Sequence, residues 1–420
     1  MSRFNQLEVL TEWKKGWPVL ASATIGYGVG GTLFQMTAGL FIVPMRENLG
    51  WSVSAVALAP IVLLSWAIVS PFAGALIDRL GSRRVALIGA SAVGGFVAML
   101  GLLPVSPIML YSLATLIGIA TALTVVPTYG RGVATWFKSG VGLAFGITLS
   151  GSTLVATFMI PATSHIIQSE GWRMGYLGLA AVMLGIGLPT IFFGFREKPA
   201  AELSAETTAV EERPVTGLAF SQVVKDGRFW LYIATFFISC IPLGGFGSHL
   251  QPLLAYQGFA LPTAISLGVA LVISISIGRV VGGILLDRVW PFALGGALLI
   301  TAALGAAALG HITGSGPLII PFVVVCIIGV GQGAEADFIA FFALRSFGLK
   351  AFSTIAGIFG MVGTFGVAVG GFGFSAVYDL QGSYLTACYI AGACWVIGGL
   401  MLIGTGLFDN HMKRKVLRVA

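Results

Sequence analysis

The stretch that decides the fold is GALIDRLGSRR at residues 74–84, which follows a long apolar run. A shorter copy, GILLDR, stands at residues 283–288, so two Asp-Arg pairs lie about half the chain length apart. A weaker echo at a similar offset pairs Phe137-Lys138 with residues 347–350. We infer that the two halves of the chain are related by duplication.

The composition around these motifs indicates a helical membrane protein. Of the 420 residues, 57% are hydrophobic and 9% are charged, whereas soluble domains carry about 25% charged residues. A transmembrane helix needs about 20 apolar residues, so the chain has room for roughly a dozen. Continuous apolar runs such as residues 85–103 exclude an outer-membrane barrel, whose strands alternate apolar with polar residues. The 59 glycines are typical of membrane helices that pack closely.

The polar stretch 196–228 divides the apolar runs into two sets of six. We therefore expect an all-α membrane protein with twelve transmembrane helices in two pseudo-symmetric six-helix bundles, residues 1–195 and 229–420, joined by a cytoplasmic linker at 196–228. The first run lacks a cleavage site of small residues, so we expect a retained span and not a signal peptide. The spans are expected near residues 17–43, 53–77, 85–103, 107–131, 139–168, 174–195, 229–256, 262–286, 291–312, 317–344, 349–377 and 383–408.

The distribution of Lys and Arg sets the expected orientation, because short cytoplasmic loops retain them. With both termini inside, only Arg46 and Arg173 fall in outer loops, and Arg279 falls within a span. We expect a multi-pass protein of the cytoplasmic (inner) membrane with both termini in the cytoplasm. The scattered loop charges explain the net charge of +7 without a nucleic-acid partner. The expected partners are the lipid bilayer and a small solute, with the chain acting as a monomer.

The sequence lacks the motifs typical of metal sites, ATP-driven transport and dinucleotide binding. The four cysteines lie in apolar runs without CxxC spacing, so no metal site is expected. No GxxxxGK[ST] phosphate loop occurs, which excludes ATP-driven transport. The glycines of residues 26–31 lie inside a span without a preceding strand, so they indicate helix packing, not dinucleotide binding. We expect no enzyme, no catalytic residues and no cofactor.

The motif at residues 74–84 resembles the signature loop of the major facilitator superfamily, G-x-x-x-D-R-x-G-x-R-R, and its degenerate second copy is also typical of that family. The resemblance implies the fold expected above and a secondary transporter that works by alternating access. A carboxylate and a guanidinium at helix ends can pair with each other and with helix dipoles, holding one conformer shut at the cytoplasmic face. The candidate gating residues are Gly74, Asp78, Arg79, Arg83, Arg84, Arg131, Asp287 and Arg288.

A narrower resemblance is to bacterial monocarboxylate porters and the related oxalate-formate antiporter. It rests on ENLGWS at residues 47–52, on the stretch 136–146 that enters the fifth span, and on an arginine in the eighth span. Two departures stand out. Residues 25–31, IGYGVGG, replace the acidic motif of the animal monocarboxylate transporters, and residues 351–376 contain no charge, so the lysine of the antiporter is missing. The resemblance implies that Arg279 binds the substrate anion.

Arg279 is also a candidate because of its position: an ionised side chain at bilayer depth costs about 3 kcal/mol of insertion free energy. It lies eight residues before Asp287, about 12 Å inside the cytoplasmic end at 1.5 Å per residue. Its helix neighbours Ser276, Gly282 and Gly283 are small, which leaves space beside it. A planar cation with five donors suits bidentate capture of a carboxylate. The alternative is a structural ion pair with an acid of the tenth span.

Glu335 and Asp337 are the acids in the middle of the tenth span. Two positions correspond to about 200° around a helix, so a regular helix cannot direct both to one cavity. The glycines of residues 329–333 could, however, distort the helix. Glu335 shares its face with Gln332, a candidate substrate ligand. Desolvation favours the protonated form of a buried carboxylate and a nearby arginine favours the ionised form, so either acid is a candidate for proton coupling, against a salt-bridge or packing role.

Three further polar residues are candidate substrate ligands. His249 follows a proline and three glycines within residues 242–247, which should break the seventh span near its outer half. Broken helices are where transporters place binding groups, and bacterial monocarboxylate porters carry a substrate-site histidine in this span. The alternative for His249 is a position at the outer interface. Tyr27 and Gln35 in the first span can donate to a carboxylate, with packing as the alternative.

The function that fits these residues is secondary transport of a small organic monocarboxylate together with a proton. One intramembrane arginine balances one carboxylate, and a proton with a monoanion carries no net charge. Alternatives within transport are a carboxylate exchanger and a carrier of another organic anion, such as an aromatic acid. Drug export is disfavoured because the fifth span reads LSGSTL at residues 149–154 and lacks the Gly-Pro-x-x-Gly-Gly signature. A non-transporting sensor is the alternative from another class, but no signalling domain is evident.

Overall fold

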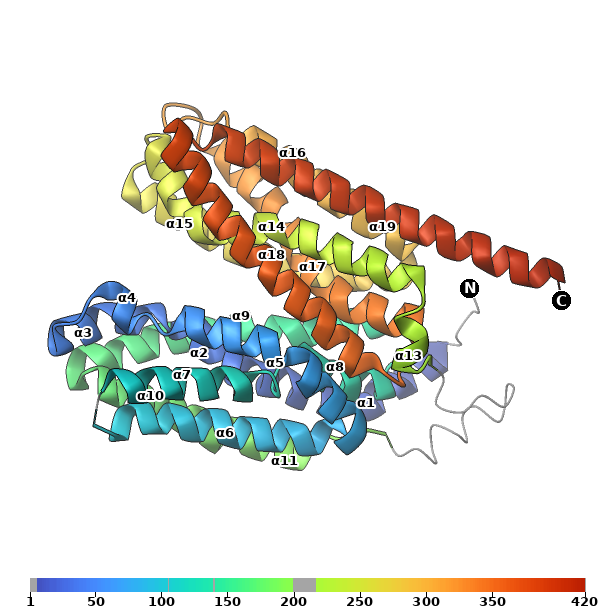
Figure 1. Ribbon diagram of the computed structural model, residues 1–420, viewed down its shortest axis with the longest axis horizontal. Coiled ribbons are helices and arrows are strands. Elements are labelled where there is room, and N and C mark those ends of the chain that lie inside the picture. The colour runs from blue at the N-terminus through green and yellow to red at the C-terminus, as the bar shows by residue number, and fades with distance from the viewer. Residues whose placement is uncertain (1–5, 105, 139, 199–216, 420) are drawn as a thin grey trace. The chain divides into compact units, whose positions relative to one another are not determined.

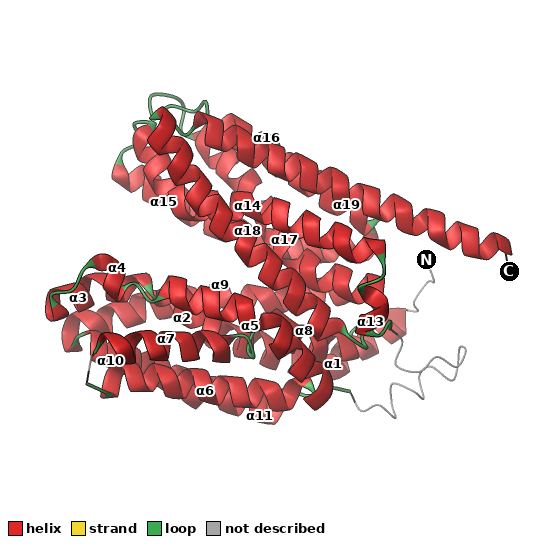
Figure 2. Cartoon of the chain, in the orientation of Figure 1, coloured by secondary structure: helices red, strands yellow, loops and turns green. Residues whose placement is uncertain are grey.

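The computed structural model describes residues 6–104, 106–138, 140–198 and 217–419, and over these residues it is built of helices joined by short loops (Figures 1 and 2). Within these ranges, eleven helices are long and apolar enough to cross a membrane. The prediction of an all-α membrane protein is therefore confirmed. The chain groups into two compact units, Met1–Ala219 with Phe342–Met361, and Phe220–Phe341 with Val362–Ala420.

The first unit contains the helices that correspond to the first six expected spans. Their bounds are α1 Gln6–Val29, α2 Gly31–Thr37, α3 Gly39–Leu49, α4 Val53–Val56, α5 Ala59–Leu80, α6 Ser82–Leu102, α7 Pro107–Thr121, α8 Val126–Trp136, α9 Val141–Glu170, α10 Trp172–Val182, the π-helical turn η1 Met183–Gly187, and α11 Leu188–Gly194.

The second unit contains six long helices after the short α13. Residues 342–361, which include the end of α17 and the beginning of α18, group with the first unit. The bounds are α13 Phe220–Val223, α14 Gly227–Tyr256, α15 Leu261–Arg288, α16 Pro291–Leu309, α17 Ile319–Phe347, α18 Phe352–Gln381 and α19 Leu385–Val419.

The expected linker at 196–228 is only partly described, since residues 199–216 lie outside the described residues. Beyond this gap, Gly217 forms an isolated antiparallel bridge with Gly348. The Leu218 N–H donates to the Phe347 carbonyl at 2.9 Å. The chain is thus attached to the end of α17 before it enters α13.

The first and fourth expected spans are interrupted. The first breaks at Gly30, whose backbone is extended, and the fourth breaks between α7 and α8, where Pro127 has no N–H to donate. The two breaks meet, because the Gly31 N–H donates to Thr124 Oγ1 at 3.2 Å. A side-chain hydroxyl thus satisfies a backbone group that the missing helical turn leaves free, as hydrocarbon requires.

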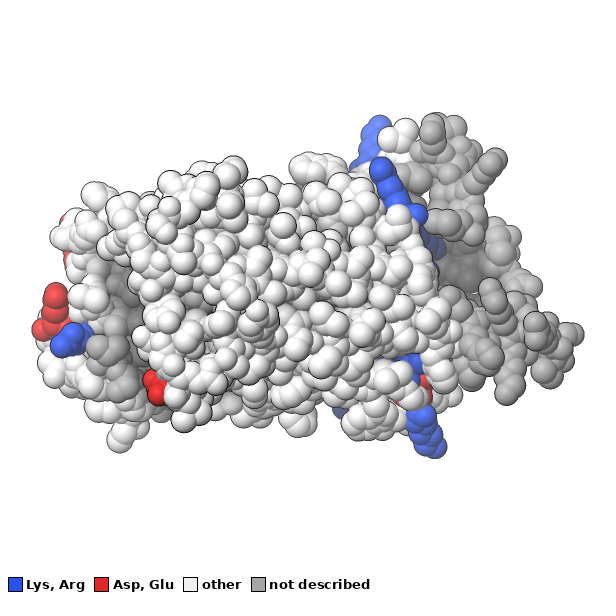
Figure 3. Space-filling view, turned by 90° about the horizontal axis from the view of Figure 1, so that it is seen from above, with Lys and Arg blue, Asp and Glu red and all other residues white. Residues whose placement is uncertain are grey.

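Uncharged surface covers the middle of the face shown in Figure 3, and charged side chains lie only toward its two ends. Large apolar side chains are exposed, among them Phe372 at 78% and Leu304 at 68%. In water such exposure is unfavourable, whereas in a bilayer lipid tails cover it. The exposed apolar surface therefore agrees with a membrane environment.

Glycines bring α14 and α18 into backbone contact inside the second unit. A Cβ at Gly244 would overlap the Val367 carbonyl, and a Cβ at Gly370 would overlap the Ile241 carbonyl. Membrane helices lack a hydrophobic driving force toward each other, so close approach at small residues supplies much of the attraction between them.

This crossing predicts that Gly370→Ala destabilises the protein and Gly373→Ala does not. A Cβ at Gly373 has no atom within 4 Å, so the control adds the same methyl group on the same helix without overlap. Overpacking costs about 1–3 kcal/mol, and we expect Gly370→Ala to lower the melting temperature in detergent by several degrees relative to Gly373→Ala. Equal melting temperatures would contradict the packing described here.

Candidate functional site

Arg279 is held against α17 by glycines on both helices. A Cβ at Gly278 would overlap the Val330 carbonyl, and one at Gly333 would lie 3.1 Å from the Arg279 backbone nitrogen. The side chain of Arg279 is half-buried. The close crossing of α15 and α17 therefore places the guanidinium beside the helix that carries both candidate acids.

Asp337 lies one helical turn beyond Gly333 on α17. It is fully buried and interacts electrostatically with Arg279. Neither Asp337 oxygen has a hydrogen-bond partner within the described part of the chain. A buried carboxyl group without a hydrogen-bond partner is an incomplete arrangement.

Glu335 points to other helices. Its Oε1 accepts a hydrogen bond from the Cys240 thiol of α14 at 3.5 Å. Ser239 and Trp395 also interact with this carboxyl group, although neither Ser239 Oγ nor Trp395 Nε1 has a hydrogen-bond partner among the described atoms. The two acids of α17 therefore have different neighbours, as expected for a regular helix.

The glycines of residues 329–333 do not distort α17, which is helical from Ile319 to Phe347. They are used for packing instead. A Cβ at Gly329 or Gly333 would meet the backbone of α15, and a Cβ at Gly331 would meet Ala302 of α16. The helix is uninterrupted at these positions, and alternate glycines contact two neighbouring helices. Gln332 is 7% exposed, and its Nε2 has no described partner.

The expected break before His249 is wrong. α14 is helical from Gly227 to Tyr256 with Pro242 inside, and its glycines Gly244 and Gly245 pack against α18. Pro242 lacks a backbone donor, but the helix continues through it.

Both ring nitrogens of His249 lie within hydrogen-bond distance of other groups. Nδ1 lies 3.4 Å from the Tyr384 hydroxyl, and Nε2 lies 3.1 Å from the Gly371 carbonyl and 3.1 Å from Ser375 Oγ. Burial raises the pKa of Tyr384, and Tyr378 and Asp379 raise it further. The phenol therefore keeps its proton and can donate to Nδ1, which leaves Nε2–H to donate to Gly371. A substrate role for His249 stays a prediction.

Tyr27 and Gln35 lie on either side of the break at Gly30. Tyr27 is buried and its ring makes an edge contact with Tyr129, with 6.3 Å between centroids. Gln35 Nε2 is buried and has no partner in the described ranges, and neither has the Tyr129 hydroxyl. The sequence reasoning missed Tyr129, which is fully buried on α8. These donors lie at the irregular part of the first unit.

Asp78 caps the beginning of α18. Its carboxylate accepts from the Ser353 N–H at 3.1 Å, the Thr354 N–H at 2.9 Å and the Thr354 hydroxyl at 2.7 Å. A carboxylate at a helix N-terminus satisfies free N–H groups and interacts favourably with the helix dipole. Gly74 permits the approach, since a Cβ there would overlap the Ser353 carbonyl.

Arg131 joins Asp78 to a second cap. Its guanidinium lies 2.7 Å from Asp78 Oδ1 and 3.3 Å from Glu197 Oε1, and it donates to the Leu349 carbonyl at 3.1 Å. Glu197 in turn accepts from the Ser82 N–H at 2.5 Å, at the beginning of α6. The sequence reasoning missed Glu197, because only folding brings its loop to this helix end.

The other candidate gating residues make fewer described contacts. Arg83 donates to the Phe192 carbonyl at 2.6 Å and lies over the Phe192 ring. Arg79 and Arg84 are exposed. In the second copy of the motif, Asp287 is half-buried and Arg288 is exposed.

A separate ion-pair cluster fixes the beginning of α14. Arg228 pairs with Asp226 at 2.6 Å and with Asp409 of α19. Burial alone would raise the pKa of Asp226, but hydrogen bonds from the Arg228 side chain and backbone more than offset it and hold this pKa below its usual value. Asp226 therefore stays ionised at neutral pH and caps the helix.

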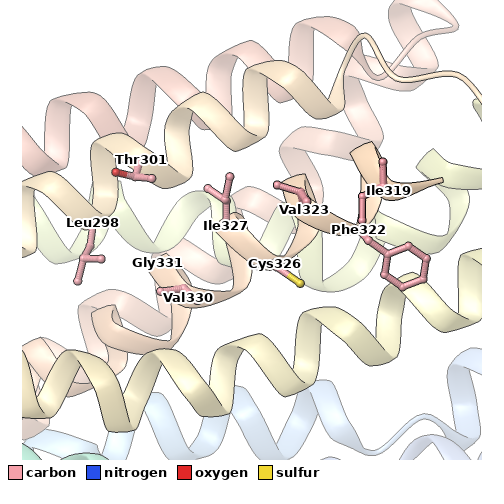
Figure 4. A pocket seen from close by; sticks show the side chains of 9 residues that line it. All are labelled: Leu298, Thr301, Ile319, Phe322, Val323, Cys326, Ile327, Val330 and Gly331. Carbon is pink, nitrogen blue, oxygen red and sulfur yellow. The ribbon is translucent and has the colours of Figure 1, made fainter. Parts of the chain in front are cut away.

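A cavity of 480 Å³ lies between α16 and α17, and its lining contains no charged side chain (Figure 4). Anion binding needs donors or positive charge, so this cavity is not the expected carboxylate site. Its lining residues are Leu298, Thr301, Ile319, Phe322, Val323, Cys326, Ile327, Val330 and Gly331.

The sequence profile of the Major Facilitator Superfamily matches residues 23–371. The chain belongs to this superfamily. It is therefore a multi-pass membrane protein, and the resemblance seen in the signature loop is confirmed. In the superfamily's own motif, Asp78 is the residue that makes the described helix cap.

Proteins with similar sequences match this chain at low identity, and their names include MFS-type transporters. The chain is 26% identical to the "Uncharacterized MFS-type transporter YcxA" of Bacillus subtilis, over 55% of this chain and 56% of that protein. It is 27% identical to an "MFS-type transporter" of Gibberella moniliformis, over 66% of this chain and 63% of that protein. It thus spans less than two thirds of either relative. It is 28% identical to "Monocarboxylate transporter 11" of Mus musculus, over 83% of this chain and 73% of that protein.

Solved structures give the fold. The fucose:proton symporter FucP of E. coli matches with a TM-score of 0.69 at 13% identity, over 94% of this chain and 99% of that one. At this identity the likeness concerns the fold alone. It supports the two-bundle architecture expected for a major facilitator protein.

Because Asp78 and Arg131 belong to one capping network, we predict that substitutions at these two positions have non-additive effects on stability. Asp78→Asn and Arg131→Gln should each lower the melting temperature, because each leaves a partly buried charge or donor unpaired. The double variant should lose less than the sum of the two, since residues in one network couple by about 0.5–3 kcal/mol. Glu47→Gln, at an exposed position, is the control and should change little. Additive losses would contradict the network.

Proposed function

We propose that this superfamily member carries a small organic monocarboxylate across the cytoplasmic membrane together with a proton, by alternating access, with Arg279 binding the carboxylate. The observation that carries the proposal is Arg279 itself: a guanidinium well inside α15, which crosses closely the helix that carries two buried acids. Such a residue is retained in a membrane span mainly for a function.

The chemistry of the guanidinium favours a carboxylate over other solutes. Its planar fork donates two parallel hydrogen bonds to one carboxylate. A monoanion neutralises one arginine, whereas a dianion calls for a second cation.

The acids of α17 supply the coupling. Before substrate binds, an internal carboxylate neutralises Arg279, and the substrate must take its place. An acid that loses its cation in a buried site is costly as an anion, so anion binding and proton binding favour each other. Loading of both releases Arg279 from its internal partner, which permits the halves to rock.

The relatives support this proposal to a limited degree. Mouse monocarboxylate transporter 11 shares 28% identity over most of this chain, and its name states the substrate class proposed here. The fucose:proton symporter matches in fold only.

Uptake by proteoliposomes tests the proposal. We expect an inward proton gradient to drive uptake of at least one of labelled lactate, acetate, oxalate and benzoate, with a monocarboxylate preferred. Arg279→Gln should lower uptake at least tenfold, because a charge-assisted hydrogen bond contributes about 1.5–3 kcal/mol and 1.4 kcal/mol corresponds to tenfold. Arg279→Lys should retain part, since it keeps the charge but loses the fork.

Arg46→Gln is the control, because Arg46 is an exposed arginine at the end of α3. It should transport like the wild type. Absence of uptake of every acid, or full uptake by Arg279→Gln, would refute carboxylate binding at this residue. Preference for benzoate would favour an aromatic acid carrier.

A further inference from the structure

The cavity between α16 and α17 opens on the surface that faces lipid. Two of its lining residues, Ile319 and Val323, are 68% and 49% exposed. Leu304, three residues after the lining residue Thr301 on α16, is as exposed as Ile319. Lipid tails cover such apolar side chains in a bilayer. The cavity is therefore continuous with the interface between the protein and the lipid.

The cavity is long and narrow. Gly331 follows Ile319 by 12 positions, which is about 18 Å along α17, and one leaflet provides about 15 Å of hydrocarbon. Figure 4 shows Ile319 and Phe322 at one end of the row of lining side chains, and Leu298 and Gly331 at the other. A volume of 480 Å³ over this length gives a mean cross-section of about 27 Å². A helix about 10–12 Å across needs several times that area, so the space fits a single chain and not another helix.

The lining is suited to hydrocarbon and not to water. The Thr301 hydroxyl donates its proton to the Ala297 carbonyl at 2.7 Å, and the Cys326 thiol is a weak donor. A buried water needs two to four polar partners, which this lining does not supply. The volume of 480 Å³ lies within the range of about 300–1,000 Å³ that ligand sites occupy. The ligand that matches this lining is an apolar chain.

The loop at the Ile319 end shows which part of a lipid is recognised. Residues 310–318, all of them described, contain no Lys, Arg, Asp or Glu. Their titratable side chain, His311, lies 2.6 Å from the Tyr389 hydroxyl. Selection of an anionic headgroup needs clustered basic residues. The contacts therefore recognise the hydrocarbon chain and do not select the charge of the headgroup.

We propose that this cavity binds one acyl chain of a membrane phospholipid, which enters beside Ile319 and reaches Gly331 in the middle of α17. The deep end of the cavity adjoins a helix crossing, because Val330 lines the cavity and its carbonyl is the atom that a Cβ at Gly278 of α15 would overlap. A bound chain thus contacts the turn of α17 that packs on α15. It stabilises the packing of α15, α16 and α17, whichever solute the protein carries.

Photolabelling in lipid tests the proposal. The purified protein is placed in nanodiscs that hold one copy each, with a phospholipid whose acyl chain ends in a photoactivatable diazirine. We expect adducts on residues 298–301 and 319–331 that saturate at one per protein. Phosphatidylcholine and phosphatidylglycerol probes should label these residues equally, because the neighbouring loop carries no ionised side chain.

Variants that fill the cavity should block this labelling. Val323→Phe from α17 and Thr301→Phe from α16 each place a ring in the space, so each should lower the adducts several-fold. Ile320→Phe is the matched control, because Ile320 is also 49% exposed on α17 and does not line the cavity. It should be labelled like the wild type.

Melting temperatures separate cavity filling from misfolding. In lipid-poor detergent, Val323→Phe or Thr301→Phe should melt above the wild type, because the ring replaces the missing chain. Added phospholipid should then raise the melting temperature of the wild type and of Ile320→Phe more than that of the filled variants. A variant that only misfolds would melt lower in both conditions.

Several results would overturn the proposal. One is labelling that spreads over exposed residues such as Leu304 and Phe372 without saturating, since it shows only the lipid that surrounds any membrane protein. Another is undiminished labelling in both filled variants. A strong preference for phosphatidylglycerol would show that the headgroup is recognised. Loss of labelling in discs that hold two copies would show that the cavity is an interface between copies.

Discussion

The guanidinium of Arg279 is the constraint on which the second unit depends. An ionised group inside a membrane span must be compensated, and α17, the helix beside it, carries the buried acids Glu335 and Asp337. The two helices α15 and α17 cross closely, which glycines such as Gly278 and Gly333 permit. The composition is rich in glycine and poor in charged residues, and the crossing of α15 and α17 contains both close-packed glycines and one of the few charges inside a span.

In the first unit, the paired charged side chains lie at helix ends and not in the middle of a span. Asp78, Arg131 and Glu197 form a chain at helix ends, where free N–H groups donate to a capping carboxylate. The motif that identifies the superfamily is therefore mainly a capping device for α18 and, through Arg131, for α6. Its other arginines, Arg79 and Arg84, are exposed. We expect this network to be broken and remade during transport.

Features carried by short stretches could be predicted from the sequence. Apolar runs predicted the helices, and the 200° between positions two apart predicted that Glu335 and Asp337 have different neighbours. Contacts made only by folding could not be predicted: Cys240 beside Glu335, Glu197 beside Arg131, and the hydroxyl of Thr124 at the break in the first span. The glycines of α14 and α17 were interpreted as positions where a helix can break or bend, whereas in the structure they pack against neighbouring helices. Glycine allows both, so the sequence alone does not distinguish them. The roles proposed for His249, Tyr27, Gln35 and Gln332 stay predictions.

The central claim is that one monoanion and one proton move together without net charge. It is tested most directly by recording luminal pH in proteoliposomes while potassium and valinomycin set the membrane voltage. Protein-free and Arg279→Gln vesicles correct for acid that crosses the lipid unaided. We predict that addition of the carboxylate acidifies the lumen at a rate that does not change with voltage. Uptake that follows the voltage, or that leaves the luminal pH unchanged, would contradict the account.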